Sequence, residues 1–192
     1  YELEYLCFAP LNELYVHGAN PIPYWLRLFR HLCQWFADAQ HALALSPSDQ
    51  AQILQDSHCL LVDKTRERMA TFLRASGLNG NAPVTLNGKA LPSLNEVVDI
   101  CLAKVDVSAV VPGVLHGDLC FSNVLFDSRA DRIKLIDPRG MAYNGTHCIT
   151  GDLRYDLAKL THSVCGYYDC IIAGAFDIDE GKGLDFEFAL HI

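Results

Sequence analysis

The sequence has no apolar run long enough to cross a membrane, and no cluster of lysine and arginine interrupts its acidic background. The longest apolar stretches, 109–115 and 170–176, fall far short of the roughly 20 residues of a transmembrane helix. The 192 residues include 23 Asp and Glu against 15 Lys and Arg, a formal net charge of -8 that repels nucleic-acid phosphates. We therefore expect neither a membrane span nor a nucleic-acid partner.

Paired cysteine motifs are also absent. The eight cysteines form no C-x-x-C, and the His58-Cys59 and His147-Cys148 pairs have no second pair at a zinc-like spacing. We expect buried free thiols rather than disulfides or zinc ligands, in a reducing, cytoplasmic setting. Because 51% of the residues are hydrophobic, the chain is expected to fold rather than to be disordered.

Apolar periodicity predicts mostly helices. They are expected at 11–16, 21–45, 48–55, 63–75, 95–104 and from Asp152 through Ile171. Asn87-Gly88 between two apolar segments predicts a β-hairpin over 84–91, and Ser93 with Glu96 fits a capping box. Short strands are expected at 1–6, 111–115, 123–127 and 132–136. The acidic residues after Phe176 are interpreted as a solvated tail or the start of a new element. The sequence thus predicts an α+β protein, mainly α.

One segment carries groups suited to chemistry. Asp118, Asn123 and Asp137 each lie next to an apolar strand segment, so the strands would bring them to one edge of a small sheet. Such oxygen ligands suit Mg²⁺, which takes its remaining ligands from water and substrate phosphates. A carboxylate that the metal does not use could accept a proton from a substrate hydroxyl. The arrangement indicates phosphoryl transfer.

The pattern H-G-D-x-x-x-x-N at 116–123, followed by Ile136-Asp137, resembles the catalytic and metal-binding segment of aminoglycoside phosphotransferase and choline kinase-like enzymes, relatives of protein kinases. The resemblance implies Asp118 as the catalytic base, with Asn123 and Asp137 as ligands of Mg²⁺ that bridges the phosphates of ATP. It also implies that His116 is structural and holds the loop through a side-chain hydrogen bond.

The fold that this resemblance implies is a protein-kinase-like C-terminal lobe at 8–192, with helices around a small β-hairpin catalytic segment. Residues 1–7 would be the hinge strand, and the backbone of Glu4, Tyr5 and Leu6 would face the adenine. A Gly-rich loop and a strand lysine, which kinases carry in an N-terminal lobe, are not recognisable in the sequence. Because the chain also starts without Met, we expect it to be part of a longer protein, truncated at both ends and lacking that lobe.

A second segment, 151–158, resembles the G-D-x-x-Y-D-L-A helix start of the same family. Asp156 would then anchor the backbone of the catalytic loop from behind; the alternative is a carboxylate favoured only by the helix dipole. Arg139 would contact phosphate or substrate, or equally form a surface salt bridge. The turn at 136–140 and the helix at 159–169 also resemble phosphotransferase-family proteins of bacterial surface-polysaccharide synthesis.

The leading hypothesis is a Mg²⁺-dependent small-molecule kinase. It would transfer the γ-phosphate of ATP or another nucleoside triphosphate to a hydroxyl of a sugar, amino sugar or amino alcohol. The less specific resemblance, at 136–140 and 159–169, implies a role in surface-polysaccharide metabolism. Two alternatives stay open: a kinase-like binding module without chemistry, and a metal-dependent phosphohydrolase that uses water as the acceptor. The 192 residues alone are expected to bind ATP poorly and to be inactive.

Overall fold

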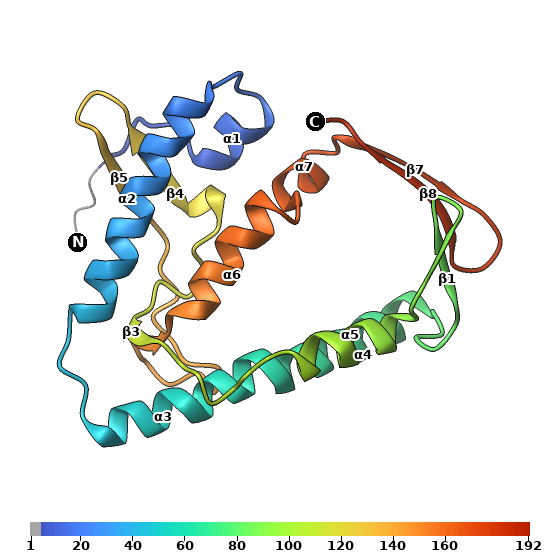
Figure 1. The fold of residues 1–192 in the computed structure, drawn as a ribbon, viewed down its shortest axis with the longest axis horizontal. Helices are drawn as coiled ribbons and strands as arrows, with labels where there is room; N and C mark the ends of the chain where they lie inside the picture. Colours follow the sequence, from blue (N-terminus) through green and yellow to red (C-terminus); the bar gives the residue numbers. More distant parts are fainter. Residues whose placement is uncertain (1–4) are drawn as a thin grey trace.

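The computed structural model describes residues 5–192 as an α+β chain (Figure 1). Its helices are α1 (Leu11–Val16), α2 (Ile22–His41), α3 (Pro47–His58), α4 (Lys64–Ser76), α5 (Leu94–Ala103), α6 (Leu153–Val164) and α7 (Tyr168–Ile172). Its strands are β1 (Val84–Leu86), β2 (Lys89–Leu91), β3 (Pro112–Val114), β4 (Val124–Asp127), β5 (Arg132–Leu135), β6 (Thr150–Asp152), β7 (Phe176–Glu180) and β8 (Asp185–Leu190). Within the described residues, no helix is both long and apolar enough for a membrane span.

The core lies where α2 packs on the segment that precedes β4. The apolar stripe of α2 buries Leu28 and Leu32 against Phe121 and Val124, all with at most 2% of their surface exposed. The Trp25 ring stacks on the Phe121 ring at 5.9 Å between centroids. Burial of each large apolar side chain contributes roughly 1.5–3 kcal/mol, so this contact fixes the chain just after the loop at 116–120.

Helices α3 and α4 form one long rod, which the periodicity had divided in two. A π-helical turn at Cys59–Asp63 joins them without a break. The rod begins at a capping box, in which Ser46 and Asp49 each bond the other's backbone, and it ends at Gly77, whose positive φ of 69° suits glycine. In Figure 1 this rod runs along one side of the molecule, with α6 between it and α2.

The strands form three small sheets. Antiparallel β4 and β5 pair Val124 with Leu135, and antiparallel β3 and β6 pair Gly113 with Gly151. The third sheet has the order β2-β1-β8-β7 and lies beyond α5, away from the other two (Figure 1). The Asn87-Gly88 hairpin and the capping box of Ser93 are confirmed.

The structure differs from the expectations for residues 1–7 and for the chain after residue 152. The helix predicted from 152 to 171 is two helices, because Tyr167 adopts a positive φ of 50° between α6 and α7. Of the two interpretations of the acidic residues after Phe176, the new element is correct and the solvated tail is wrong, because these residues alternate on the hairpin of β7 and β8. The hinge strand expected at 1–7 falls largely outside the described residues, and Tyr5, Leu6 and Cys7 belong to no strand.

The cysteine expectation is correct in one respect and wrong in another. All eight cysteines are free. Only Cys170 is buried, because the others lie on outer helix faces and in loops, so burial does not account for most of these thiols.

Candidate functional site

The loop that carries Asp118 leaves β3 and leads into β4. Its start is held at Leu115, whose N–H donates to the carbonyl of Ile149 at 2.8 Å. Gly117 makes the turn with a φ of +80°, a conformation that a side chain disfavours. A Cβ at Gly117 would also lie 2.8 Å from the Cβ of Arg139, so the loop and the turn after β5 pack closely here.

Asp156 holds this loop from the first turn of α6. Its carboxylate accepts hydrogen bonds from the backbone N–H of His116 at 2.8 Å and of Gly117 at 2.9 Å. The side chain is fully buried. Burial raises the pKa of the Asp156 carboxyl above its ordinary value, and the two N–H donors limit the increase. These bonds are the contact that the G-D-x-x-Y-D-L-A resemblance implies, and they go beyond a dipole effect.

His116 connects the loop to the end of β5. Its Nδ1 accepts from the backbone N–H of Asp118 at 3.3 Å, so Nε2 carries the proton and donates to the carbonyl of Ile136 at 2.9 Å. The imidazole is buried and does not face the open side of the site. It therefore ties Asp118 to the residue that precedes Asp137.

Asn123 closes the loop on the other side. Its Nδ2 donates to the backbone carbonyl of Asp118 at 2.8 Å and lies 3.5 Å from the Asp118 carboxylate. Its own backbone carbonyl accepts from Ile136 N–H at 3.0 Å, which continues the register of β4 and β5. The amide orientation leaves Asn123 Oδ1 without a partner among residues 5–192.

Asp137 lies one residue beyond the Asn123–Ile136 pair, at the same end of the hairpin. It is exposed and adopts a positive φ of 55°, which costs energy for a residue with a side chain. Its carboxylate has no hydrogen-bond or ion-pair partner within the described part of the chain. The structure thus brings Asp118, Asn123 and Asp137 to one end of β4 and β5.

This set of donors fits a magnesium ion. Asn123 Oδ1 and the Asp137 carboxylate are hard oxygen ligands that the protein leaves unpaired, and Mg²⁺ takes its other ligands from water and phosphate. Within residues 5–192, no group of three or more His, Cys, Asp or Glu side chains forms a metal cage. Any magnesium here would therefore depend on phosphate oxygens for much of its coordination.

Sequence reasoning missed Lys159, which lies beside the expected catalytic base. Its Nζ is 2.7 Å from Asp118 Oδ1, and both side chains are about one-third exposed, 31% and 37%. Burial alone would lower the pKa of the Lys159 ammonium, but the hydrogen bond and negative charge of Asp118, together with Tyr155 and Cys120, outweigh burial and raise that pKa. The helical spacing could have indicated this position. Lys159 follows Asp156 by three residues and Tyr155 by four, so all three lie on one face of α6.

Arg139 does not form the surface salt bridge that the sequence left open. In the described chain no carboxylate pairs with it; its Nη2 donates to the hydroxyl of Tyr155 at 3.1 Å, and its guanidinium lies 5.2 Å from the ring centre. Lys64, the first residue of α4, approaches the same hydroxyl at 3.5 Å. Burial raises the pKa of Tyr155, but Arg139, Lys64 and Lys159 together outweigh burial and lower it.

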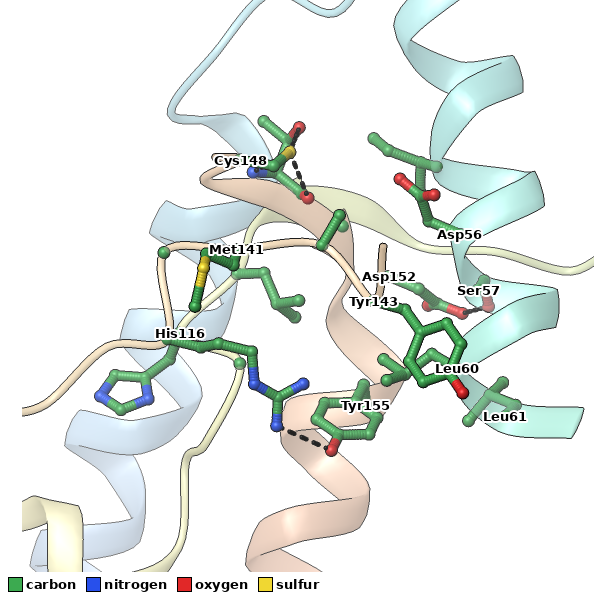
Figure 2. Close-up of a pocket in the computed structure, with 18 residues that line it drawn as sticks. Asp56, Ser57, Leu60, Leu61, His116, Met141, Tyr143, Cys148, Asp152 and Tyr155 are labelled. Carbon is green, nitrogen blue, oxygen red and sulfur yellow. Dashed lines mark hydrogen bonds between the residues drawn. The ribbon is translucent and has the colours of Figure 1, made fainter. Parts of the chain in front are cut away.

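Tyr155 separates two hollows. On one side is a narrow, partly open cavity of about 30 Å³ that His116, Ser57 and Asp152 help to line (Figure 2). It has room for one or two water molecules but not for a metabolite. In Figure 2 the Ser57 hydroxyl lies beside the Asp152 carboxylate at the edge of this cavity. It donates a hydrogen bond of 2.8 Å that connects α3 with β6.

On the other side is an open groove of about 700 Å³ between α4 and α6. Its lining is apolar at Met69, Phe72 and Val98 and basic at Lys64 and Arg68. Its volume lies in the range of small-molecule sites. No Asp or Glu lines this groove in the part of the chain that the structure describes.

Of the residues expected to face the adenine, Glu4 lies outside the described residues, the Tyr5 side chain is 89% exposed, and Leu6 belongs to no helix or strand. Comparison of the chain with protein-family models, characterised proteins and solved structures finds no match.

Proposed function

We propose that this chain carries the phosphoryl-transfer site of a Mg²⁺-dependent kinase that acts on a small hydroxyl-bearing metabolite. The observation that carries the proposal is the convergence of Asp118, Asn123 and Asp137 at one end of the β4–β5 hairpin. Asp156 and His116 fix the backbone between them. A loop held so closely suits a reaction in which positioning supplies most of the rate.

Each residue then has one task. Asp118 orients the acceptor hydroxyl and takes its proton as the oxygen attacks phosphorus. Asn123 and Asp137 would hold Mg²⁺, which would neutralise charge on the nucleotide phosphates. Lys159 places a positive charge beside Asp118, where negative charge is present before and during transfer.

The experiment uses the longest natural chain that contains these residues. Release of ADP is measured with Mg²⁺, ATP and a panel of sugars, amino sugars and amino alcohols. We expect Asp118→Asn to lower the rate roughly 10²- to 10⁴-fold, the usual share of a general base. Nucleotide binding, measured by calorimetry, should be largely unchanged. Asp179→Asn, an exposed position on β7, is the matched control and should keep the wild-type rate.

Three outcomes separate this proposal from its alternatives. A wild-type rate in Asp118→Asn contradicts the assigned base. ATP consumption that yields free phosphate without any acceptor indicates a phosphohydrolase. Nucleotide binding without turnover, over the whole panel of acceptors, indicates a binding module.

A further inference from the structure

The groove between α4 and α6 has a charge opposite to that of the protein. The chain has a formal net charge of -8, yet Lys64 and Arg68 line this groove, and Arg139, which lines the smaller cavity on the other side of Tyr155, donates to the Tyr155 hydroxyl. None of these three forms an ion pair with a carboxylate within residues 5–192. Cations without counter-ions repel one another at short range, and an anion bound between them would relieve that repulsion.

Two of the cations converge on a single polar atom. The Arg139 guanidinium and the Lys64 ammonium reach the Tyr155 hydroxyl at 3.1 and 3.5 Å, and both also lie over its ring. They approach from different elements: Arg139 from the turn after β5 and Lys64 from the start of α4. In Figure 2 a dashed line marks the hydrogen bond that the Tyr155 hydroxyl receives. A neutral phenol supplies one weak acceptor to two full charges, so their capacity to donate is mostly unused.

The position of the cluster relative to Asp118 decides what it would serve. Lys159 lies on α6 one turn after Tyr155 and contacts Asp118 at 2.7 Å. The cluster at Tyr155 therefore lies one helical turn from the lysine that contacts the expected base. The Asn123 Oδ1 and Asp137 oxygens, which suit the metal and nucleotide, belong to the end of the β4–β5 hairpin.

We propose that the phosphate acceptor carries an anionic group, a phosphate or a carboxylate, which Lys64 and Arg139 bind at Tyr155 while the rest of the acceptor lies in the α4–α6 groove. This inference rests on the proposed kinase function and narrows its acceptor. Among sugars and their derivatives it selects sugar phosphates and sugar acids over neutral sugars and amino sugars. The apolar side chains of Met69 and Phe72 would cover the ring face of such a molecule.

Binding can be measured without any phosphoryl transfer. Calorimetric titrations of the full natural chain use glucose 6-phosphate, glucuronate, glucose and glucosamine as probes. We expect one of the two anionic probes to bind at least about tenfold more tightly than the neutral and cationic ones, from one hydrogen bond to a charged group. The phosphate and carboxylate arms identify which anion is preferred. Tighter binding of glucosamine, or no binding of either anionic probe, overturns the proposal.

Charge-removing variants locate the anion. Lys64→Met and Arg139→Met should each weaken the favoured anionic probe about tenfold to a hundredfold. The matched control is Arg66→Met, which removes the same charge from α4 but at a position paired with Asp99 outside the groove. An equal effect of Arg66→Met would mean non-specific attraction and overturns the proposal.

The nucleotide is the remaining rival for these cations. Affinity for Mg²⁺·ADP should be unchanged in Lys64→Met. If that affinity falls while binding of the anionic probes does not, the cluster serves the nucleotide and the acceptor proposal is wrong. The kinase proposal is tested separately by Asp118→Asn, so each can fail without the other.

Discussion

The ammonium of Lys159 lies 2.7 Å from the carboxylate of Asp118, although 41 positions separate the two residues along the chain. The contact exists because Asp156, on the same helix, is bonded to the loop that carries Asp118. One helix therefore both holds the loop and places a positive charge at its functional end.

Removal of that charge should affect catalysis far more than stability. In Lys159→Met we expect kcat to fall at least about tenfold, because a charge next to the transferred phosphoryl group is lost. The free energy of unfolding should change by less than about 1 kcal/mol, because the pair is one-third exposed and screened by water. Steady-state kinetics and urea unfolding measure the two effects. Lys159→Arg should restore part of kcat, and no loss of activity in Lys159→Met would contradict the role.

The buried carboxylate of Asp156 should matter for stability. Asp156→Asn turns an amide N–H₂ towards one of the two backbone donors and leaves it buried without a partner. We expect a loss of about 2–3 kcal/mol in the free energy of unfolding, measured with urea. Asp179→Asn on exposed β7 makes the same chemical change and should stay within about 0.5 kcal/mol. Equal stability of both variants would mean that the Asp156 hydrogen bonds are dispensable.

Tyr155 should titrate before other tyrosines of the protein. Its pKa is lowered by Arg139 and the two lysines despite burial, whereas burial raises the pKa of Tyr15 and Tyr24. Absorbance at 295 nm should show an early ionisation that disappears in Tyr155→Phe and moves to higher pH in Arg139→Met.

The lowered pKa of Tyr155 also determines the direction in which this group changes the free energy of unfolding with pH. The folded state releases the phenolic proton before the unfolded state does, so this group adds stability as the pH rises towards its unfolded value near 10. That contribution is lost as the pH falls through the folded pKa. Tyr155→Phe should therefore lose stability, relative to the wild type, increasingly in the alkaline range. An unfolding difference that does not depend on pH would contradict this linkage.

Alanine substitutions at Gly117 and Gly174 distinguish the cost of backbone strain from the cost of a steric clash. Both adopt a positive φ, +80° and +73°, but a Cβ would meet Arg139 only at Gly117, whereas Gly174 has open space. Gly174→Ala should cost roughly 1–2 kcal/mol from backbone strain alone. Gly117→Ala should cost more in thermal or urea unfolding and should also shift the Tyr155 titration, since Arg139 must move. An equal loss of stability in Gly117→Ala and Gly174→Ala would indicate that Arg139 moves away from the added Cβ at no cost.

Local signals predicted the local structure well. The Asn87-Gly88 hairpin and the Ser93–Glu96 capping box are each decided by side chains within a few residues, and both are present. The motif likewise predicted the neighbourhood of Asp118 and Asn123, because a short loop and a tight hairpin bring them together.

Features that depend on distant partners were beyond the sequence. The residues around Lys159 do not indicate that α6 packs against the loop at 116–120. The residues around Arg139 do not indicate that its guanidinium donates to the Tyr155 hydroxyl rather than to a carboxylate. The alternation in Asp185–Leu190 favours a strand but does not name its partner. The π-helical turn at Cys59–Asp63 was missed because it has neither Gly nor Pro to mark it.

The parallel pairing of β1 with β8 has a consequence for how this protein forms. Asn87 exchanges two hydrogen bonds with the backbone of Phe188, 101 residues further along. During synthesis β1 and β2 leave the ribosome long before β8, and a lone two-stranded hairpin is barely stable in water. The sheet beyond α5 is therefore completed last, by contacts of high sequence separation, and its closure should set the pace of folding.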